Sequence, residues 1–199
     1  FNAYGIAVAV GVLLSGWLGD TWDSARVVSL GLLVFAAGAA MAAMATSLDM
    51  LVVARAMQGV GGGLFTPMVP ILLTRASPEQ PGRSLILWGS GAGYIAAAAP
   101  VLHGNFLSHQ PWHMAFFGLS GVAIFAAICI LFSVRPVAGA SERITTNYGN
   151  LFKARGLWLM LLYAFCTYGG VTYYLFITPV WLDARQIDIA WIGVILSVA

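Results

Sequence analysis

Long apolar runs, separated by short polar segments, make up most of this chain. Six complete runs occupy residues 3–19, 27–45, 50–73, 84–104, 114–134 and 156–177, and a seventh begins near Ala190. A transmembrane helix needs about 17 to 25 mostly apolar residues to cross a hydrocarbon core about 30 Å thick. The pattern therefore predicts an all-α polytopic membrane protein with six crossings and the start of a seventh.

The polar segments predict how these helices connect. Residues 47–49 are so few that the second and third helices should form a tight antiparallel hairpin. Pro67 and Pro70 lie within the third run and should bend that helix, because proline removes backbone hydrogen bonds. We expect polar connectors at 74–83 and 105–112, and a longer one at 135–155 with a short surface helix near 150–155.

Composition narrows the class of protein. Hydrophobic residues make up 60% of the chain and charged residues 8%, which is far from a soluble domain. The net charge of +2 comes from cations scattered singly between apolar runs, so we expect no nucleic-acid partner. Cys129 and Cys166 lie in apolar runs, as small buried hydrophobic residues do.

The chain contains no set of residues that indicates an enzyme or a bound cofactor. A nucleophile with its base and orienting partner cannot be assembled, and there is no Gly-x-x-x-x-Gly-Lys loop to hold a nucleotide. His103, His109 and His113 cluster in one segment without a cysteine or carboxylate, so a metal site is a weaker reading. We expect neither cofactor nor metal, and no ATP-driven pump.

The basic residues predict the orientation in the membrane. Seven of the nine lie in segments on one side, only Arg185 lies on the other, and Arg55 falls within a span. Loops rich in lysine and arginine stay in the cytoplasm. Phe1 should therefore be external, the loops containing Arg83 and Arg143 cytoplasmic, and the loop containing His109 external.

Arg55 is the strongest candidate for function. On a helix, Arg55, Gln58, Gly59 and Gly62 share one face, which combines a cation, an amide and a smooth groove for a second helix. Placing an ionisable group at membrane depth costs from about 2.5 to over 10 kcal/mol, so an arginine there suggests function. The alternative is an anchor: Arg55 is only about five residues, or roughly 7 to 8 Å, into its run and could reach the nearer interface.

Other small and aromatic residues suggest packing faces or a cavity. Gly11, Ser15 and Gly19 form a stripe for close helix contact, and Gly89, Gly93 and Ala97 form another that precedes Pro100. The second stripe predicts either gating or ordinary packing. The candidate cavity residues are Met68, Trp88, Tyr163 and Tyr168, whose aromatic members could hold an aromatic or cationic ligand. Tyrosines also collect in interface belts, which favours that role for Tyr173 and Tyr174.

Four segments resemble signatures of the major facilitator superfamily, and one of them, Trp112-His113-Met114-Ala115-Phe116-Phe117, stands where the family often has W-R-W-x-F. Gly16, Leu18 and Asp20 match the G-x-L-a-D loop signature, and Arg55-x-x-Gln58-Gly59-x-Gly61 is similar to the R-x-x-Q-G-x-G motif of helix four. Pro100 and Gly104 resemble the end of the helix-five motif of proton-driven exporters. The departures are Thr21, Ser24 and Ala25 in place of basic residues, Asp23 in place of glycine, and Ile95, Ala99 and His103 in place of glycines.

The resemblance implies a truncated major facilitator-type helical bundle. Residues 1–134 would form most of the N-terminal half (helices two to six), 135–155 the cytoplasmic central loop, and 156–199 the start of the C-terminal half. Arg55 and Gln58 would serve proton coupling. The implied gating residues are Gly16, Asp20, Arg26, Gly59, Gly62, Gly93, Pro100 and Gly104. Asp20 would latch a neighbouring helix N-terminus, or else be a solvated loop acid.

The favoured function is secondary active transport: export of a small, fairly apolar compound in exchange for protons, by alternating access. The alternatives are an uptake symporter or facilitator for a metabolite and, less favoured, a membrane-embedded enzyme or a non-transporting sensor. We expect a monomer in the inner membrane of a bacterium, with the lipid bilayer and a small-molecule substrate as its partners. The chain starts without methionine and stops about ten residues into an apolar run, which suggests a fragment.

The positions of the acidic residues limit this function. All seven lie at helix ends or in loops, so the predicted spans contain no proton carrier and no counter-ion for Arg55. If the protein exchanges protons, the carrier must come from outside this chain. We expect a membrane-embedded Asp or Glu within roughly 40 residues upstream of Phe1, or failing that in the C-terminal half, because a helix packed on the glycine face of Arg55 is the best source.

Overall fold

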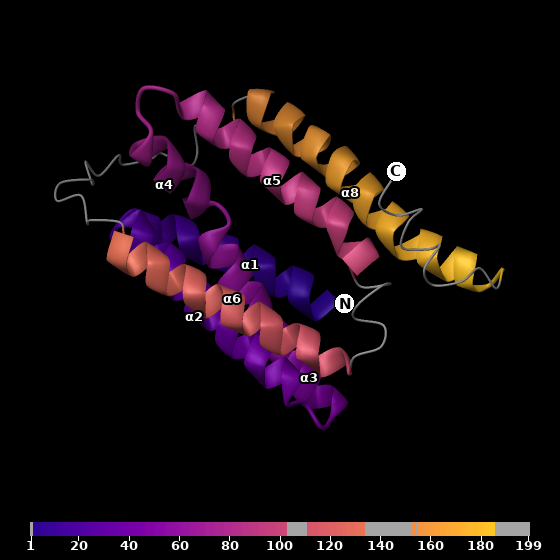
Figure 1. Ribbon diagram of the computed structural model, residues 1–199. Coiled ribbons are helices and arrows are strands. Elements are labelled where there is room, and N and C mark those ends of the chain that lie inside the picture. The colour runs from indigo at the N-terminus through magenta and orange to yellow at the C-terminus, as the bar shows by residue number, and fades with distance from the viewer. Residues whose placement is uncertain (1, 103–110, 134–152, 154, 186–199) are drawn as a thin grey trace. The chain divides into compact units, whose positions relative to one another are not determined.

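The computed structural model describes residues 2–102, 111–133, 153 and 155–185, and its regular structure there is helical throughout (Figure 1). Two compact units are formed, one by residues 1–92 and 109–142 and the other by 93–108 and 143–199. Each unit is described by itself. The predicted boundaries between the halves and the central loop stay predictions, as do the surface helix near 150–155 and the seventh run, which lie wholly or largely outside the described residues.

The helices follow the predicted apolar runs closely. They are α1 (Asn2–Gly19), α2 (Ser24–Ala43), α3 (Leu48–Phe65), α4 (Met68–Ala76), α5 (Pro81–Leu102), α6 (Trp112–Ser133) and α8 (Arg155–Asp183). Among the described residues, three stretches are long and apolar enough to cross a membrane: Ser24–Ala43, Leu48–Ala76 and Trp112–Ser133. Shorter apolar helices occur at Ala3–Gly19 and Arg155–Thr167.

In α4, α5 and α8, three helix ends differ from the sequence prediction by three residues or more. The connector expected at 74–83 is shorter, because α4 continues to Ala76 and α5 already begins at Pro81. The Thr74 hydroxyl donates to the Ile71 carbonyl at 3.0 Å, which accommodates a polar residue in the last turn of α4. Proline fits the start of a helix, where its missing N–H has no partner to lose. The helix expected to end at residue 177 continues to Asp183 with Pro179 inside it.

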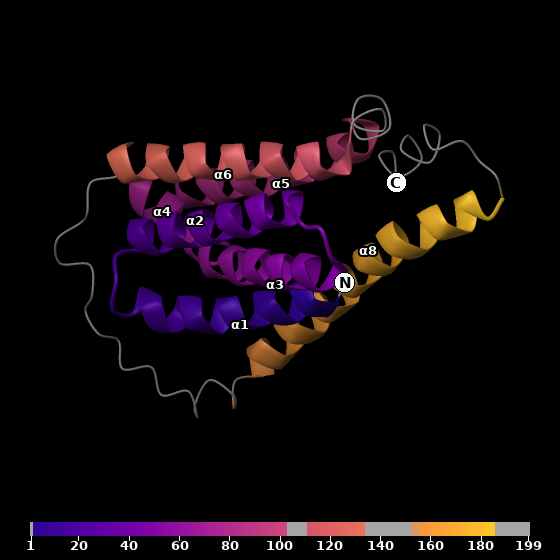
Figure 2. The same ribbon diagram turned by 90° about the horizontal axis from the view of Figure 1, so that it is seen from below.

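The first unit is built around α3. Its helices lie in the order α6, α2, α3, α1 across the bundle (Figure 2), with contacts between each neighbouring pair. Glycines allow the close approach on both sides of α3. A Cβ on Gly63 would collide with the Val8 carbonyl oxygen of α1, and one on Gly61 would collide with the Phe35 nitrogen of α2. The predicted small-residue stripe of α1 also packs closely, since a Cβ on Gly11 would lie 2.9 Å from Gly63 Cα.

The third apolar run is divided at Thr66 and Pro67, as the prolines predicted. Pro67 precedes α4, and Pro70 lies in its first turn, where backbone N–H groups have no helical partner. The Thr66 hydroxyl donates to the Gly62 carbonyl at 2.7 Å and so satisfies an acceptor at the break. Directly after the break, Met68 packs in a buried cluster with Val27 and Val28.

The hairpin between α2 and α3 is tight, as predicted, but its connector is residues 44–47 instead of 47–49, because Leu48 and Asp49 already belong to α3. Ser47 caps α3, because its side-chain oxygen accepts a hydrogen bond from the Met50 amide at 3.2 Å. Asp49 in the first helical turn faces the positive end of the helix dipole. On the other side of α2, the buried Ser120 hydroxyl of α6 donates to the Ala36 carbonyl at 2.9 Å. The Ser120 bond thus joins α6 to α2, while the Ser47 bond is local to the start of α3.

Candidate functional site

Arg55 lies in α3, seven residues after Leu48. At 1.5 Å per residue this places its Cα about 10 Å from the start of the helix. The side chain is partly buried, and its NH1 group donates to Gln58 Oε1 at 2.8 Å. The two residues are three positions apart, so the predicted shared face is confirmed for this pair. The guanidinium of Arg55 thus donates to the predicted amide, that of Gln58, which lies further along α3 toward the membrane interior.

Two aromatic rings from other helices flank the guanidinium. The Cζ atom of Arg55 lies 4.6 Å from the ring centroid of Tyr4 in α1 and 5.9 Å from that of Phe116 in α6. Both distances are within the range of cation–π attraction, which strengthens where water is excluded. Phe116 in turn stacks edge-to-face with Trp112 at 5.9 Å between centroids. Residues from α1, α3 and α6 therefore meet at one cation.

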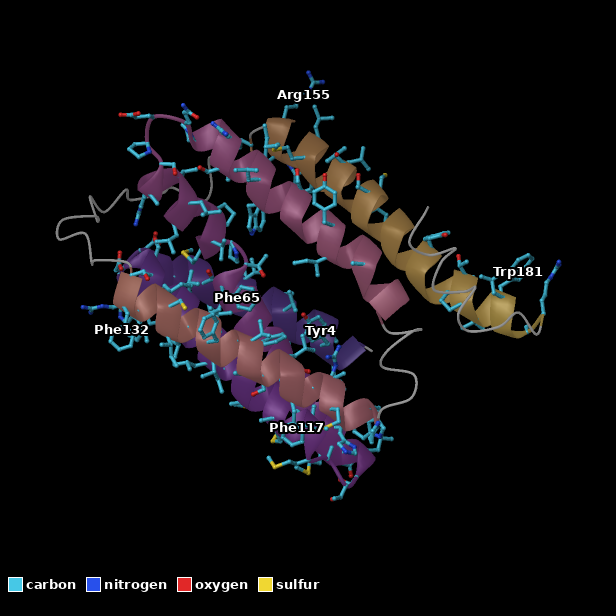
Figure 3. The ribbon with its side chains drawn as sticks, in the orientation of Figure 1. Tyr4, Phe65, Phe117, Phe132, Arg155 and Trp181 are labelled. Atoms are coloured by element: carbon cyan, nitrogen blue, oxygen red, sulfur yellow. The ribbon has the colours of Figure 1, made fainter. Side chains whose placement is uncertain are left out.

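The glycine face of α3 brings Tyr4 to Arg55. A Cβ on Gly59 would lie 2.5 Å from the Tyr4 carbonyl oxygen and 2.8 Å from Ala7 Cβ, so only glycine lets α1 approach this closely. About one turn further, a Cβ on Gly62 would lie 3.4 Å from the Tyr4 hydroxyl oxygen, which is ordinary contact distance. Figure 3 shows Tyr4 near the start of α1. The glycine face of Arg55, which the sequence analysis expected a helix from outside this chain to cover, is therefore covered by α1. A functional role for Arg55, Gln58, Gly59 and Gly62 stays a prediction.

Gln58 is the least exposed member of this site. Its side chain has no accessible surface, and its Nε2 group has no hydrogen-bond partner among the described residues. A Cβ on Gly38 of α2 would lie 2.9 Å from Gln58 Cγ, so the amide is wedged between α2 and α3. A buried amide group without a partner costs about 1 to 3 kcal/mol. Gln58 thus accepts from Arg55 through one end of its amide, while the other end has a donor to spare among the described residues.

Arg55 also lines a cavity within the first unit. Its volume is about 400 Å³, and its other walls are apolar or aromatic: Ala3, Tyr4, Leu48, Leu51, Val52, Trp112 and Phe116. These residues lie near the first turns of α1, α3 and α6, which the positive-inside pattern puts at the external end of each helix. Among the described residues that line this cavity, the guanidinium is the one charged group.

The loop between α1 and α2 forms a second, separate group of predicted residues. Asp20 is exposed, and its amide donates to the Gly16 carbonyl at 3.3 Å. Gly16 has open space where a Cβ would be, and Arg26 is exposed in the first turn of α2. Arg75 at the end of α4 reaches the start of α2, where its NH1 group donates to the Ser24 hydroxyl at 2.9 Å.

Those of the remaining predicted residues that the structure describes lie in α4, α5 and α8. Met68 packs in the core cluster with Val27 and Val28, where it fills space between helices. Trp88 is 40% exposed on α5, and Tyr163 is 71% exposed on α8. Gly93 is exposed on α5. Pro100 and Tyr168 are helical positions of α5 and α8, and Gly104, with His103 and His109, lies outside the described residues.

The sequence analysis did not assign Tyr4, Trp112 or Phe116 to the site. A signal for them was present in the topology. If Phe1 and His109 are external, the starts of the first and fifth runs lie at the same membrane face as the start of the third. Aromatic residues near those starts are then at the depth of Arg55. Which of several aromatics contacts the cation still depends on how the helices rotate and cross.

These features define a polytopic helical membrane protein with an arginine held inside the bundle by an amide and aromatic rings. The family model of the Major Facilitator Superfamily matches residues 1–199, and the chain belongs to this family of transporters.

Several transporters from bacteria resemble the chain. An uncharacterized MFS-type transporter, Rv1250, of Mycobacterium tuberculosis is 33% identical over 58% of the chain and 20% of its own length. A putative multidrug resistance protein, MdtD, of Klebsiella pneumoniae is 30% identical over 65% of the chain and 28% of its own length. The tetracenomycin C resistance and export protein of Streptomyces glaucescens is 29% identical over 85% of the chain and 31% of its own length.

The fold is also found in a solved structure. A crystal structure of the peptide transporter POT (E310Q mutant) in complex with alafosfalin has a TM-score of 0.57 and 21% sequence identity, over 85% of this chain and 38% of that chain. At this identity the likeness concerns the fold alone. The chain spans between a fifth and about a third of the length of the three relatives named above.

Proposed function

We propose that the complete protein is a secondary active transporter that exports a small, fairly apolar compound in exchange for protons, by alternating access. The family supports transport, and two relatives carry multidrug resistance or export in their names. The protein would act as a monomer in the inner membrane of a bacterium. The gating positions in this proposal are Gly16, Asp20, Arg26, Gly59, Gly62, Gly93, Pro100 and Gly104.

The observation that carries the proposal is the environment of Arg55. A guanidinium that only anchored its helix would extend to the interface. Here it donates to an amide further along α3 and lies against Tyr4 and Phe116 from two other helices. A cation held in this way attracts an anionic partner at membrane depth, and a carboxylate that releases this cation when protonated would couple protons to transport.

Uptake symport or facilitation of a metabolite is the second candidate. The helix-five motif favours it, since Ile95, Ala99 and His103 stand where proton-driven exporters have glycines. No combination of nucleophile and base in the sequence supports a membrane-embedded enzyme.

Transport in everted membrane vesicles tests the proposal. The complete coding sequence is expressed, vesicles are acidified inside by respiration, and acridine orange reports the proton gradient. Addition of fluorescent apolar dyes should be followed by dye accumulation and proton release, and both should stop when nigericin and valinomycin collapse the gradient. Vesicles with an empty vector are the control. Dye movement that is unchanged without the gradient would leave a facilitator and overturn proton exchange.

A further inference from the structure

The guanidinium of Arg55 has hydrogen-bonding capacity that the described chain does not use. Its five N–H donors lie in one plane, and among the described residues the acceptor it reaches is Gln58 Oε1. Tyr4 and Phe116 lie against the group as aromatic rings, which attract a cation without accepting its N–H groups in the plane. The remaining donors are therefore available to a planar anion.

The charge of Arg55 is also uncompensated within the described residues. No salt bridge to it is formed there, and the nearest acid along α3, Asp49, is exposed in the first turn of the helix. A cation that is partly removed from water strongly favours an anionic partner. Arginine suits a carboxylate in particular, because its fork of donors matches the two carboxylate oxygens.

The cavity beside Arg55 supplies space for the rest of such a ligand. Ligand cavities in proteins measure about 300 to 1,000 Å³ and combine apolar walls with a few polar groups. This one measures about 400 Å³ and has a single cation in a wall of aliphatic and aromatic side chains. Leu48, Leu51 and Val52 form the aliphatic side, and Tyr4, Trp112 and Phe116 the aromatic side. An apolar body with one anionic group is complementary to both features.

We propose that this cavity is a binding site for an amphipathic organic carboxylate, with the carboxylate on the in-plane donors of Arg55 and the apolar body against Phe116, Trp112 and Leu51. The inference names the substrate class of the proposed transporter. The ligand's role as a substrate rests on that proposed function, whereas binding of the ligand to the cavity does not. Because the lining residues are at the predicted external ends of their helices, the site lies on the side where an exported compound leaves.

Binding to the complete protein in lipid nanodiscs tests the site. Isothermal titration measures phenylbutyrate and its uncharged isostere phenylbutyramide, with empty nanodiscs subtracted to remove partition into lipid. Charge-assisted hydrogen bonds are worth about 1.5 to 3 kcal/mol, so phenylbutyrate should bind about ten times more tightly than the amide, or better. Arg55→Gln should remove this preference and leave the amide's affinity within about twofold.

A second variant tests whether the positive charge of Arg55 binds the carboxylate, without replacing Arg55 itself. Leu51 lines the cavity one helical turn before Arg55. Leu51→Glu would put a carboxylate at the i, i+4 spacing that pairs best with a following cation, and it should compete with phenylbutyrate for Arg55. Leu51→Gln has the same shape without the charge and should retain the preference for the carboxylate.

The aromatic wall has a matched control on the same helix. Phe116→Leu should weaken binding of both compounds, because it removes a ring from the cavity wall. Phe117 is the next residue of α6, is 46% exposed and does not line the cavity, and Figure 3 shows it on α6. Phe117→Leu should leave both affinities unchanged.

Equal binding of the two compounds to the wild-type protein would overturn the site. So would a carboxylate preference that persists in Arg55→Gln, or the absence of phenylbutyrate binding between pH 5.5 and 8, which would mean that another part of the protein occupies Arg55. Failure of proton-coupled transport with intact, Arg55-dependent binding would overturn the proposed function and leave the site. Transport of uncharged dyes without phenylbutyrate binding would overturn the site and leave the proposed function.

Discussion

The contacts of Arg55 depend on the planar shape of its guanidinium as well as on its charge. One edge of the guanidinium donates to Gln58 while aromatic rings lie beside it. A lysine ammonium is a compact, strongly hydrated charge on a flexible stem, so it cannot make the same set of contacts. Of the two explanations offered by the sequence, a functional cation and a helix anchor, the contacts in the bundle favour the first.

Arg55→Lys should therefore abolish or severely reduce coupled transport, by about tenfold or more, with normal amounts of protein in the membrane. The measurement is the initial rate of dye export in everted vesicles, normalised to protein detected by immunoblot. Arg55→Gln should be at least as defective. If the lysine and glutamine variants both transport near the wild-type rate, Arg55 is only an anchor.

At the scale of helices, the fit of α1 against α3 depends on single glycines. Gly59→Ala places a methyl group 2.5 Å from the Tyr4 carbonyl oxygen, so α1 must move away. Overpacking of this kind costs about 1 to 3 kcal/mol. We expect the complete protein to unfold at a lower temperature or detergent concentration, and Tyr4 to lose its contact with Arg55.

Gly5→Ala is the matched control, because it lies in α1 but has open space where its Cβ would be. Alanine is a better helix former than glycine by up to about 1 kcal/mol. The two substitutions should therefore change stability in opposite directions. Equal effects on the unfolding transition would mean that α1 and α3 are not in close contact at Gly59.

The elements themselves were largely predictable, because their signals are local. Ser47 followed by Asp49 marks the start of α3, and Pro67 marks its end, since both act through the backbone of adjacent residues. Arg55 and Gln58 were predicted to meet because a helix alone sets their spacing. Met68 was predicted to line a cavity, but it packs in the core, and an apolar run contains no local signal for which side a methionine will face.

The contacts of Tyr4 and Phe116 with Arg55 could not be predicted in the same way. These residues lie about fifty to sixty positions from Arg55 in the sequence. Their contact is set by how closely Gly59 lets α1 approach and by where α6 lies along α2. Both depend on the summed packing of several helices. Sequence periodicity indicates a face of one helix, whereas a site between helices requires the crossing geometry as well.

At the scale of the whole molecule, orientation in the membrane decides which side the Arg55 cavity serves. Single cysteines at positions 83, 109 and 143 are introduced into a protein without Cys129 and Cys166, and intact cells are treated with an impermeant thiol reagent. Position 109 should be labelled from outside, and positions 83 and 143 only after the membrane is opened, because seven of nine cations lie on their side. Labelling of position 143 but not 109 would refute this topology.

The distribution of acidic residues along the whole chain determines where a proton carrier must be. The acids that the structure describes, Asp20, Asp23, Asp49, Glu79 and Asp183, lie at helix ends or in loops, and the apolar pattern predicts the same for the other two. The unperturbed pKa of tyrosine is about 10, which is too high for proton exchange under physiological conditions. A proton exchanger therefore needs a carboxylate from a span outside this chain, placed where it can pair with Arg55 and compete there with an anionic substrate.

We predict such an Asp or Glu within a membrane span that precedes residue 1 by no more than roughly 40 residues, or failing that in the C-terminal half, since a spanning helix needs about 20 residues. The complete gene sequence checks its presence. Replacing it by Asn or Gln should abolish proton release in vesicles while Arg55-dependent binding of phenylbutyrate is kept or strengthened, because the competing carboxylate is gone. A complete protein with no acid in any span would exclude proton antiport through a membrane carboxylate and favour facilitated diffusion.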